Sequence, residues 1–329
     1  MKKVTVIGKV HQSGLDILYG HGGLEITEFI DPAVPVSPDS ITGADALLVR
    51  TGQVSEDDIK DANNLRVVSR HGVGCDNVPV AALSARGIPV TIVGPVNAIS
   101  VAEQTLSMML SLTKRVAEYD QAVREGNWNI RNSLKTAELA GKTLLLLGLG
   151  RIGSEVAKRA AAFALNILVY DPYLSKAEIN AAGATKIENW RDGLGSVDIL
   201  SLHLPLNQAT RHIINAKTLA AMKPSAIVLN AARGGLIDEE ALCAELSGRM
   251  AAGGAGLDTF EVEPPDPDAP LLKLPNVVLS PHSAAMTEES ARKMGEVSAQ
   301  NIVNGLEGNL DPGLIFNRKA LEGREPYEE

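Results

Sequence analysis

A run of leucines at residues 144–147 leads directly into Gly148-Leu-Gly-Arg-Ile-Gly153, and this junction constrains the fold more than any other feature. The apolar run predicts a buried strand, and the glycines predict a tight turn into a helix. Such a turn points backbone N–H groups and the positive end of the helix dipole at a ligand, which suits the pyrophosphate of a dinucleotide. Gly148, Gly150 and Gly153 fit the turn, the close approach of the ligand and the packing of helix on strand.

The next apolar run, residues 167–170, ends at Asp171. A carboxylate in this place can accept hydrogen bonds from the ribose hydroxyls of an adenosine and repels a 2′-phosphate. Pro172 and Tyr173 follow, so no arginine is present there to bind such a phosphate. The sequence therefore predicts a site for NAD rather than NADP. A glycine-rich turn that binds nothing is disfavoured, because strand, turn, helix and acid occur in the required order.

Short apolar runs alternate with helical patterns along the chain, which predicts parallel βαβ units. A length of 329 residues suggests about two domains. The first series of predicted strands comprises residues 4–7, 26–29, 46–49, 65–69 and 89–93. The second series comprises residues 143–147, 167–170, 198–201, 226–230, 252–257 and 277–279.

The nucleotide-binding series begins only near the middle of the chain, which makes it an insertion in another lobe. We expect a substrate-binding lobe with a flavodoxin-like sheet from residues 1–98 and 286–329, and an NAD-binding Rossmann domain from residues 99–285. The predicted fold class is α/β, with two doubly wound parallel-sheet lobes. One long helix is predicted from Ser100 to about Glu118, and Thr287 is a plausible N-cap for a last helix of about twenty residues.

The net charge of −9 argues against nucleic acid or an anionic membrane surface as a partner. The longest apolar stretch, residues 99–112, contains Glu103 and is too short to span a bilayer. Two distant cysteines, Cys75 and Cys243, predict neither a disulfide framework nor a zinc site, and no other metal site is expected. The N-terminus leads straight into a strand, without a secretory segment, so the expected compartment is the cytoplasm.

Three polar segments follow the last three predicted strands: Asn230-Ala-Ala-Arg233, the stretch from Asp258 to Glu263, and Ser280-Pro-His282. Open α/β sheets place their ligand sites at this edge. A guanidinium can hold a carboxylate by paired hydrogen bonds, and an imidazole that titrates near neutrality can protonate a carbonyl oxygen. A neighbouring carboxylate orients the imidazole and favours its charged form. The combination suits the reduction of a 2-keto acid.

Each of these residues also has a structural interpretation. Arg233 is equally compatible with a surface charge beside a helix, and His282 with a strand-end histidine that bonds the backbone. Glu261 and Glu263 are both candidates for the partner of the imidazole, and periodicity does not choose between them.

At this point the chain resembles the D-isomer-specific 2-hydroxyacid dehydrogenase family, especially its phosphoglycerate dehydrogenases and hydroxypyruvate reductases. The resemblance rests on residues 70–77 (RHGVGCDN), 97–104 (NAISVAEQ), 203–206 (HLPL), the glycine turn and the three strand-end segments. These segments occur in the family's order over roughly residues 1 to 320. Gln104 departs from the histidine of many members, and Asn207 from a common threonine.

The resemblance implies that Arg233, Glu263 and His282 form a catalytic triad, because the family's glutamate directly precedes proline. It implies that the backbone of Gly72, Val73 and Gly74 helps Arg233 to bind the substrate carboxylate. The residues implied to contact NAD are Gly148, Gly150, Arg151, Ile152, Gly153, Asp171, Leu204, Pro205, Ala231, Ala232, Asp258 and Ala285.

The far end of the substrate is less constrained. Arg50 aligns with an arginine that grips the distal group of the substrate in the phosphoglycerate enzymes. Both Arg50 and Arg70 end predicted strands and suit an anionic group, but either is equally able to pair with a nearby acid.

The resemblance thus implies an NAD-dependent oxidoreductase that interconverts a D-2-hydroxy acid and its 2-keto acid by hydride transfer. The implied substrate is 3-phosphoglycerate or an acid like hydroxypyruvate or glyoxylate, and the implied assembly is a homodimer. We expect no C-terminal regulatory domain of the kind that longer phosphoglycerate dehydrogenases carry. An NAD-sensing, non-catalytic dimer of the same fold, like the transcriptional corepressors, is the alternative.

Overall fold

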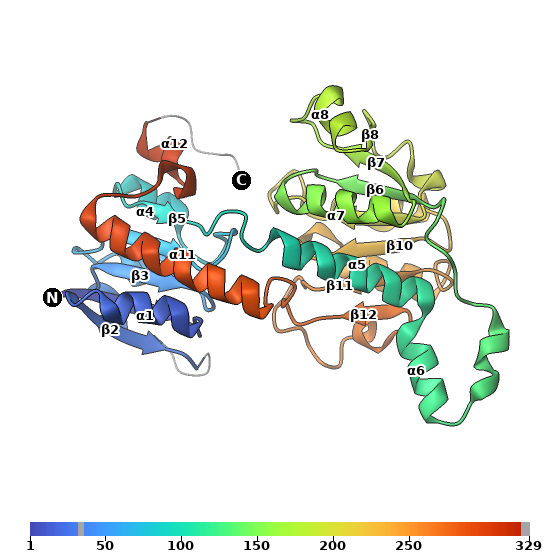
Figure 1. Ribbon diagram of the computed structural model, residues 1–329, viewed down its shortest axis with the longest axis horizontal. Coiled ribbons are helices and arrows are strands. Elements are labelled where there is room, and N and C mark those ends of the chain that lie inside the picture. The colour runs from blue at the N-terminus through green and yellow to red at the C-terminus, as the bar shows by residue number, and fades with distance from the viewer. Residues whose placement is uncertain (32–35, 324–329) are drawn as a thin grey trace. The chain divides into compact units, whose positions relative to one another are not determined.

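The computed structural model describes residues 1–31 and 36–323. They form two compact units: a discontinuous unit from residues 1–97 and 286–323, and a central unit from residues 98–285. Each unit contains one parallel sheet with helices packed against it (Figure 1). The predicted α/β class with two parallel-sheet lobes is therefore confirmed. Residues 324–329 of the predicted substrate-binding lobe lie outside the described part of the chain, and the functional assignment of that lobe stays a prediction.

The sheet of the discontinuous unit has the strand order β2-β1-β3-β4-β5, which is the flavodoxin-like order. Its strands are β1 (Lys2–Ile7), β2 (Leu24–Phe29), β3 (Ala46–Val49), β4 (Val67–Arg70) and β5 (Val90–Thr91). The prediction of a strand over residues 89–93 was too long. Beyond Thr91 the N–H of Ile92 donates to the carbonyl of Leu314, and the N–H of Val93 donates to Gly72, which lies in the loop after β4.

Helix α11 (Glu288–Glu307) brings the chain back and covers one face of this sheet. As predicted, Thr287 is its N-cap, and the Thr287 side chain accepts a hydrogen bond from the N–H of Ser290. Gly308, with a φ of 80°, ends the helix in the left-handed conformation that glycine favours. The remaining helices of the unit are α1 (Gln12–Gly20), α2 (Pro38–Thr42), α3 (Glu56–Ile59), α4 (Val80–Ala85), η5 (Pro312–Leu314) and α12 (Arg318–Leu321).

The sheet of the central unit has the order β12-β11-β10-β9-β6-β7-β8, a doubly wound arrangement with β6 beside β9 at the switch point. Its strands are β6 (Thr143–Leu147), β7 (Asn166–Tyr170), β8 (Thr185–Lys186), β9 (Ile199–Leu202), β10 (Ile227–Asn230), β11 (Gly254–Leu257) and β12 (Val277–Leu279). The sequence predicted six of these seven strands. It missed β8, because two residues at a sheet edge carry no detectable periodicity.

The predicted helix from Ser100 to Glu118 was wrong in one respect, because it is two helices. Helix α5 (Ala98–Lys114) ends before Arg115, whose φ of 52° breaks the helical repeat, and α6 (Val116–Arg124) begins after it. Helix α6 and the short helix η1 (Trp128–Ser133) then extend away from the body of the unit (Figure 1). In residues 1–31 and 36–323, no helix has both the length and the apolar character needed to cross a membrane.

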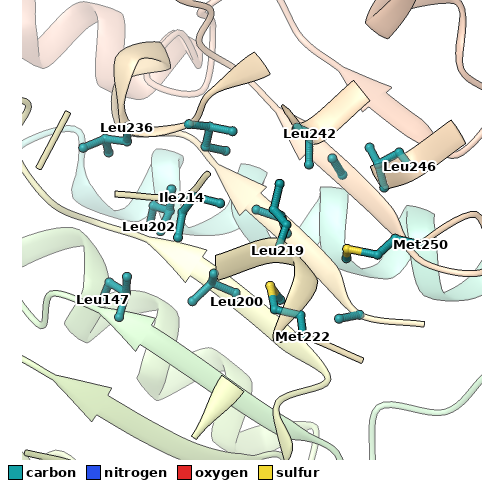
Figure 2. Packing of buried hydrophobic residues seen from close by; sticks show 14 of the residues in the cluster. Leu147, Leu200, Leu202, Ile214, Leu219, Met222, Leu236, Leu242, Leu246 and Met250 are labelled. Atoms are coloured by element: carbon teal, nitrogen blue, oxygen red, sulfur yellow. The ribbon is translucent and has the colours of Figure 1, made fainter. Parts of the chain in front are cut away.

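The core of the central unit lies on both faces of its sheet. Leu145 and Leu147 belong to one apolar cluster, and Leu144 and Leu146 to another, because alternate side chains of a strand point to opposite faces. Figure 2 shows part of the first cluster, where side chains of β9 pack near those of α9 (Ala216–Ala220) and α10 (Glu239–Ser247). Helices α5 and α7 (Arg151–Ala162) contribute to the second cluster. The unit also contains α8 (Lys176–Ala181), η2 (Leu194–Ser196), η3 (Gly234–Leu236) and η4 (Pro270–Lys273).

The contact between α1 and α11 gives a test of the packing in the discontinuous unit. A Cβ atom at Gly14 would lie 2.5 Å from the carbonyl oxygen of Gly295, so Gly14→Ala must push the two helices apart. We expect overpacking to cost about 1–3 kcal/mol in the free energy of unfolding. Gly20→Ala is the matched control, since it lies in the same helix with no atom within 4 Å and gains only helix propensity. Urea denaturation measures both, and equal midpoints would contradict the packing argument.

Candidate active site

The glycine turn joins β6 to α7. The surroundings of a Cβ atom differ at each of its three glycines. Gly148 has a φ of 94°, and a Cβ there would lie 2.5 Å from the carbonyl oxygen of His203. A Cβ at Gly153 would lie 2.4 Å from the carbonyl oxygen of Gly148, so this glycine lets the helix pack against the turn. Gly150 is the N-cap of α7 and faces open space, since a Cβ placed there would have no atom within 4 Å. Open space before a helix N-terminus fits the pyrophosphate of NAD.

Asp171 follows β7 and braces this turn. One carboxylate oxygen accepts a hydrogen bond from the N–H of Leu149 and the other from the N–H of Tyr173, both at 3.0 Å. These two bonds fix the carboxylate beside the turn, and each oxygen keeps a lone pair for another donor. The position agrees with a contact to ribose hydroxyls, and the brace is a second role that the sequence did not indicate.

Strands β10, β11 and β12 are neighbours in the sheet, so the segments that follow them lie at one edge. These segments carry Arg233, Glu263 and His282. Leu204 and Pro205 follow β9, and Ala231 and Ala232 follow β10, which places them at the same edge of the sheet. Ala285 is the last residue before the discontinuous unit resumes.

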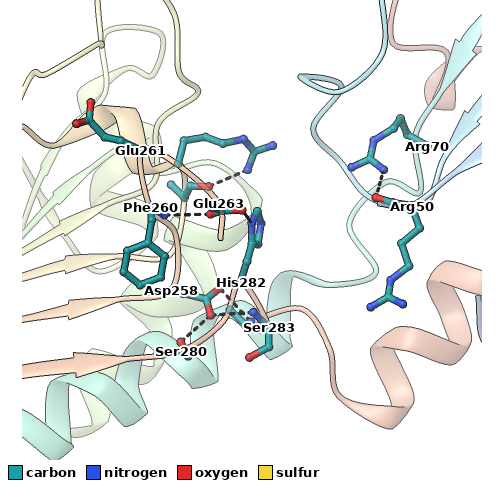
Figure 3. A network of polar contacts seen from close by, with 12 residues as sticks. Arg50, Arg70, Asp258, Phe260, Glu261, Glu263, Ser280, His282 and Ser283 are labelled. Carbon is teal, nitrogen blue, oxygen red and sulfur yellow. Dashed lines mark hydrogen bonds and ion pairs between the residues drawn. The ribbon is translucent and has the colours of Figure 1, made fainter. Parts of the chain in front are cut away.

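His282 and Glu263 form a direct pair (Figure 3). The Nδ1 atom of His282 lies 2.7 Å from Oε2 of Glu263, and the other carboxylate oxygen accepts from the N–H of Phe260 at 3.0 Å. Because Nδ1 donates to the carboxylate, Nε2 is the nitrogen left to exchange a proton. Nε2 has no hydrogen-bond partner among the described residues, and the His282 side chain is half exposed.

The environment of Glu263 keeps its carboxyl group ionised. Partial burial acts to raise the pKa of Glu263, but the hydrogen bonds from His282 and from the Phe260 N–H outweigh it. The positive charge of Arg233 acts in the same direction, and the pKa of Glu263 lies below its usual value of 4.5. An ionised carboxylate at this distance stabilises the protonated imidazole.

The structure also separates Glu263 from its rival Glu261. The carboxylate of Glu261 pairs with Nε2 of His212, and Arg211 lies 3.7 Å from it. The N–H of Glu261 donates to the carboxylate of Glu239 at 2.7 Å. Glu261 is therefore occupied elsewhere, and Glu263 is the one that contacts His282.

Glu239 and His212 belong to this network but were missed by the sequence analysis. Burial raises the pKa of Glu239, and the negative charges of Glu261 and Glu263 add to that effect. Neither residue lies in a recognisable motif, and both are far along the chain from Glu261. Only the folded loops bring them together.

Asp258 anchors the segment that carries His282 (Figure 3). Its almost fully buried carboxylate accepts hydrogen bonds from the Ser280 hydroxyl at 2.6 Å, the Ser283 N–H at 2.9 Å and the Ala284 N–H at 3.0 Å. Gln104 donates to the Ser280 hydroxyl at 3.2 Å, which links α5 to the same segment. This carboxylate therefore holds the Ser280 side chain before His282 and the backbone after it.

Arg233 lies in a loop that packs tightly on the Glu263 loop. The backbone carbonyl of Arg233 accepts a hydrogen bond from the Asn230 side chain at 2.8 Å, and its guanidinium donates to the Ala232 carbonyl at 2.7 Å. A Cβ at Gly234 would lie 1.9 Å from the carbonyl carbon of Phe260, so only glycine fits beside Arg233. The two loops are thereby held in one relative position.

In the discontinuous unit, Arg70 shapes the loop that contains Gly72, Val73 and Gly74. Its guanidinium donates to the carbonyls of Gly74 at 2.8 Å, Val49 at 2.6 Å and Arg50 at 2.8 Å. Arg70 therefore supports the backbone at the end of β4.

Arg50 behaves differently. It donates to the Lys9 carbonyl at 2.6 Å, and its second nitrogen lies 3.7 Å from the sulfur of Met286. Burial lowers the pKa of Arg50. Within the described part of the chain Arg50 forms no ion pair, so the alternative of a nearby acid is not observed for this residue.

Comparison with known proteins identifies the family. Residues 106–284 match the family model described as D-isomer specific 2-hydroxyacid dehydrogenase, NAD binding domain. A hydroxypyruvate reductase from Thermotoga maritima is 42% identical over 300 residues, which cover 89% of this chain and 94% of the relative. A D-3-phosphoglycerate dehydrogenase from Methanocaldococcus jannaschii is 40% identical over 317 residues, which cover 96% of this chain but only 59% of the relative.

A solved structure agrees with this match. D-lactate dehydrogenase from Aquifex aeolicus, complexed with NAD and lactic acid, is similar with a TM-score of 0.84 and 25% identity, over 99% of both chains. The chain therefore belongs to the D-isomer specific 2-hydroxyacid dehydrogenase family, and its central unit contains the family's NAD-binding domain. The resemblance seen in the motifs is confirmed, and nothing among these relatives supports the non-catalytic alternative.

The anchoring role of Asp258 can be tested by stability. Asp258→Ala leaves one buried and one partly buried backbone N–H group without an acceptor, and we expect it to lower the free energy of unfolding by about 2–5 kcal/mol. Ser280→Ala, which removes one donor and keeps the carboxylate, should cost about 1 kcal/mol. Chemical denaturation followed by tryptophan fluorescence compares the two. A smaller loss for Asp258→Ala than for Ser280→Ala would disprove the anchor.

Proposed function

We propose that this chain is an NAD-dependent oxidoreductase that interconverts a D-2-hydroxy acid and its 2-keto acid. The observation that carries the proposal is the 2.7 Å pair of His282 and Glu263 at the sheet edge that also bears Arg233. The names of the relatives, phosphoglycerate dehydrogenase and hydroxypyruvate reductase, support a small 2-hydroxy or 2-keto acid as the substrate.

In this mechanism bound NAD supplies or accepts the hydride. Arg233 binds the substrate carboxylate by paired hydrogen bonds and polarises the carbonyl group. During reduction, protonated His282 donates the Nε2 proton to the carbonyl oxygen, while Glu263 holds Nδ1 and stabilises the imidazolium charge. During oxidation, neutral His282 accepts the hydroxyl proton at Nε2. The hydrogen bond from Nδ1 to Glu263 keeps Nε2 as the nitrogen that exchanges the proton in either direction.

The remaining residues are proposed to bind the substrate or NAD, according to the strand end or loop in which they lie. The backbone N–H groups of Gly72, Val73 and Gly74 bind the substrate carboxylate, and Arg50 binds the substrate's far end. The pyrophosphate is held by the glycine turn and the start of α7, and the ribose by the carboxylate that follows β7. These residues are Gly148, Gly150, Arg151, Ile152, Gly153 and Asp171. The nicotinamide side is lined by Leu204, Pro205, Ala231, Ala232, Asp258 and Ala285.

The central prediction concerns the proton donor. His282→Ala should lower the turnover number for NADH-dependent reduction about 10²–10⁴-fold, the usual contribution of general acid catalysis. NADH binding, measured by fluorescence titration, should be retained.

Arg233→Ala should lower turnover and also raise KM, because it removes the carboxylate contact. Glyoxylate, hydroxypyruvate, phosphohydroxypyruvate, sulfopyruvate and pyruvate are the substrates to screen.

His21→Ala serves as the matched control, because His21 is a surface histidine paired with Glu307 in the discontinuous unit. Near-normal turnover in His282→Ala would show that another group transfers the proton. Loss of NADH binding in the same variant would show a folding defect instead.

We also propose that the chain acts as a homodimer in the cytoplasm. The arm of α6 and η1 exposes large apolar side chains, including Trp128 at 64% and Leu134 at 85% of their full accessibility. Val116 and Val123 on the same arm are also exposed. A second copy of the chain would remove this surface from water.

The dimer proposal predicts that Trp128→Glu combined with Leu134→Glu produces monomers. Sedimentation velocity of the full chain measures the mass directly. Tyr173→Glu is the control, because Tyr173 is also exposed but lies outside the arm. A wild-type monomer, or an unchanged dimer in the double variant, would refute this use of the arm.

A further inference from the structure

Arg50 and His71 lie side by side beyond the ends of β3 and β4. The two strands pair in parallel with Val49 opposite Arg70, and the N–H of His71 continues the ladder by donating to the Val49 carbonyl at 2.9 Å. Because side chains alternate along a strand, Arg50 and His71 point to the face that Ser69 also uses. Ser69 donates to the Ser298 carbonyl of α11 at 2.9 Å, so this face is the one that α11 covers.

The imidazole of His71 is buried and has no partner. Only 5% of the residue is exposed, and within the described part of the chain neither Nδ1 nor Nε2 makes a hydrogen bond. Burial lowers the pKa of His71 to about 4, and the positive charges of Arg50 and Arg70 contribute. At neutral pH the ring is therefore uncharged, with one N–H donor and one lone pair. Native proteins rarely leave both functions of a buried group unused.

Two further groups of the same unit lie toward the start of α11. Ser290 is buried, and its hydroxyl also has no partner among the described residues. It belongs to the same buried stripe of α11 as Met294 and Ser298, at a spacing of one helical turn. Met286, just before α11, contacts the Arg50 guanidinium. Ser290 and Met286 thus lie at the start of α11, the helix that covers the face of the sheet to which Arg50 and His71 point.

The chemistry of these groups selects an anion as their ligand. Arg50 is a partly buried cation without a carboxylate, and Figure 3 shows its side chain extending away from Arg70, which bonds the Arg50 carbonyl. A neutral imidazole donates one hydrogen bond, and a serine hydroxyl donates another. A metal cation would be repelled by the two guanidinium groups. An anion would instead be attracted by the Arg50 charge and can accept a hydrogen bond from the neutral imidazole of His71.

We propose that His71 is a specificity-determining residue that binds, together with Arg50, a second anionic group at the far end of the substrate. This inference rests on the proposed function and narrows it to 2-keto acids that carry a phosphate, a sulfonate or a second carboxylate. His71 directly precedes Gly72, the start of the backbone segment proposed for the first carboxylate. The short loop of residues 71–74 would then contact both ends of a small dianionic or trianionic acid.

A kinetic experiment tests the substrate class with the full chain. The ratio of kcat/KM for 3-phosphohydroxypyruvate to kcat/KM for hydroxypyruvate is measured in wild type, His71→Leu and His71→Gln. We expect His71→Leu to lower this ratio about tenfold or more, since a hydrogen bond to a charged group is lost. His71→Gln keeps a donor and an acceptor and should restore much of the ratio. Oxaloacetate and sulfopyruvate, used in the same way, distinguish carboxylate and sulfonate from phosphate.

A purely structural role of His71 gives a different result. Leucine would then be tolerated or would weaken both substrates alike, and the ratio would stay unchanged in both variants. That outcome overturns the proposal.

A second measurement does not depend on turnover. The chain has six histidines, and their imidazole carbon signals can be followed by NMR after 13C labelling, with His71 assigned by its absence in His71→Gln. Inorganic phosphate should shift the His71 signal in a saturable way in wild type, but not in Arg50→Met. An equal shift with chloride at the same ionic strength, or no shift, refutes the anion site.

The two experiments separate the two proposals. A chain that reduces none of the 2-keto acids but binds phosphate at His71 would disprove the proposed function and leave the anion site standing. A chain that reduces these acids without any response of His71 would support the proposed function and disprove the anion site.

Discussion

The active edge of the central sheet depends on how closely its backbone segments approach one another. At Gly148, Gly153 and Gly234 a single methyl group would overlap a neighbouring carbonyl. These contacts fix the end of β6 against the end of β9, and the Arg233 loop against the Glu263 loop. Since the loops have no room to shift, the side chains they carry keep one geometry, which is what a site for hydride transfer requires.

Three carboxylates, two of them buried, hold this edge together. Asp171 braces the glycine turn, Asp258 bonds the Ser280 hydroxyl before His282 and two backbone N–H groups after it, and Glu263 bonds both His282 and the Phe260 N–H. Each of these acids therefore has an observed structural role beside the chemical role proposed for it. In the discontinuous unit the guanidinium of Arg70 has the corresponding structural role, since it bonds three carbonyls, whereas Arg50 bonds one carbonyl and forms no ion pair with the described residues.

Much of the fold was predictable because it follows from periodicity and local chemistry. The βαβ order, the glycine turn, and Thr287 as the N-cap of α11 are all properties of neighbouring residues, and the structure agrees with them. The break at Arg115 and the two-residue strand β8 were not predictable. A left-handed residue within a helical pattern and a very short edge strand are set by tertiary packing, and their local sequence carries no signal.

The same division holds for the site. The sequence by itself determined the family, the NAD fingerprint and the candidates Arg233, Glu263 and His282, because those residues sit in motifs at strand ends. Only the tertiary structure decided that Glu261 pairs with His212, that Asp258 anchors the segment around His282, and that His71 is buried beside Arg50 with no hydrogen bond to its ring among the described residues. Hydrogen bonds and burial between distant segments depend on how the loops pack, and a linear pattern of residue types does not encode those distances.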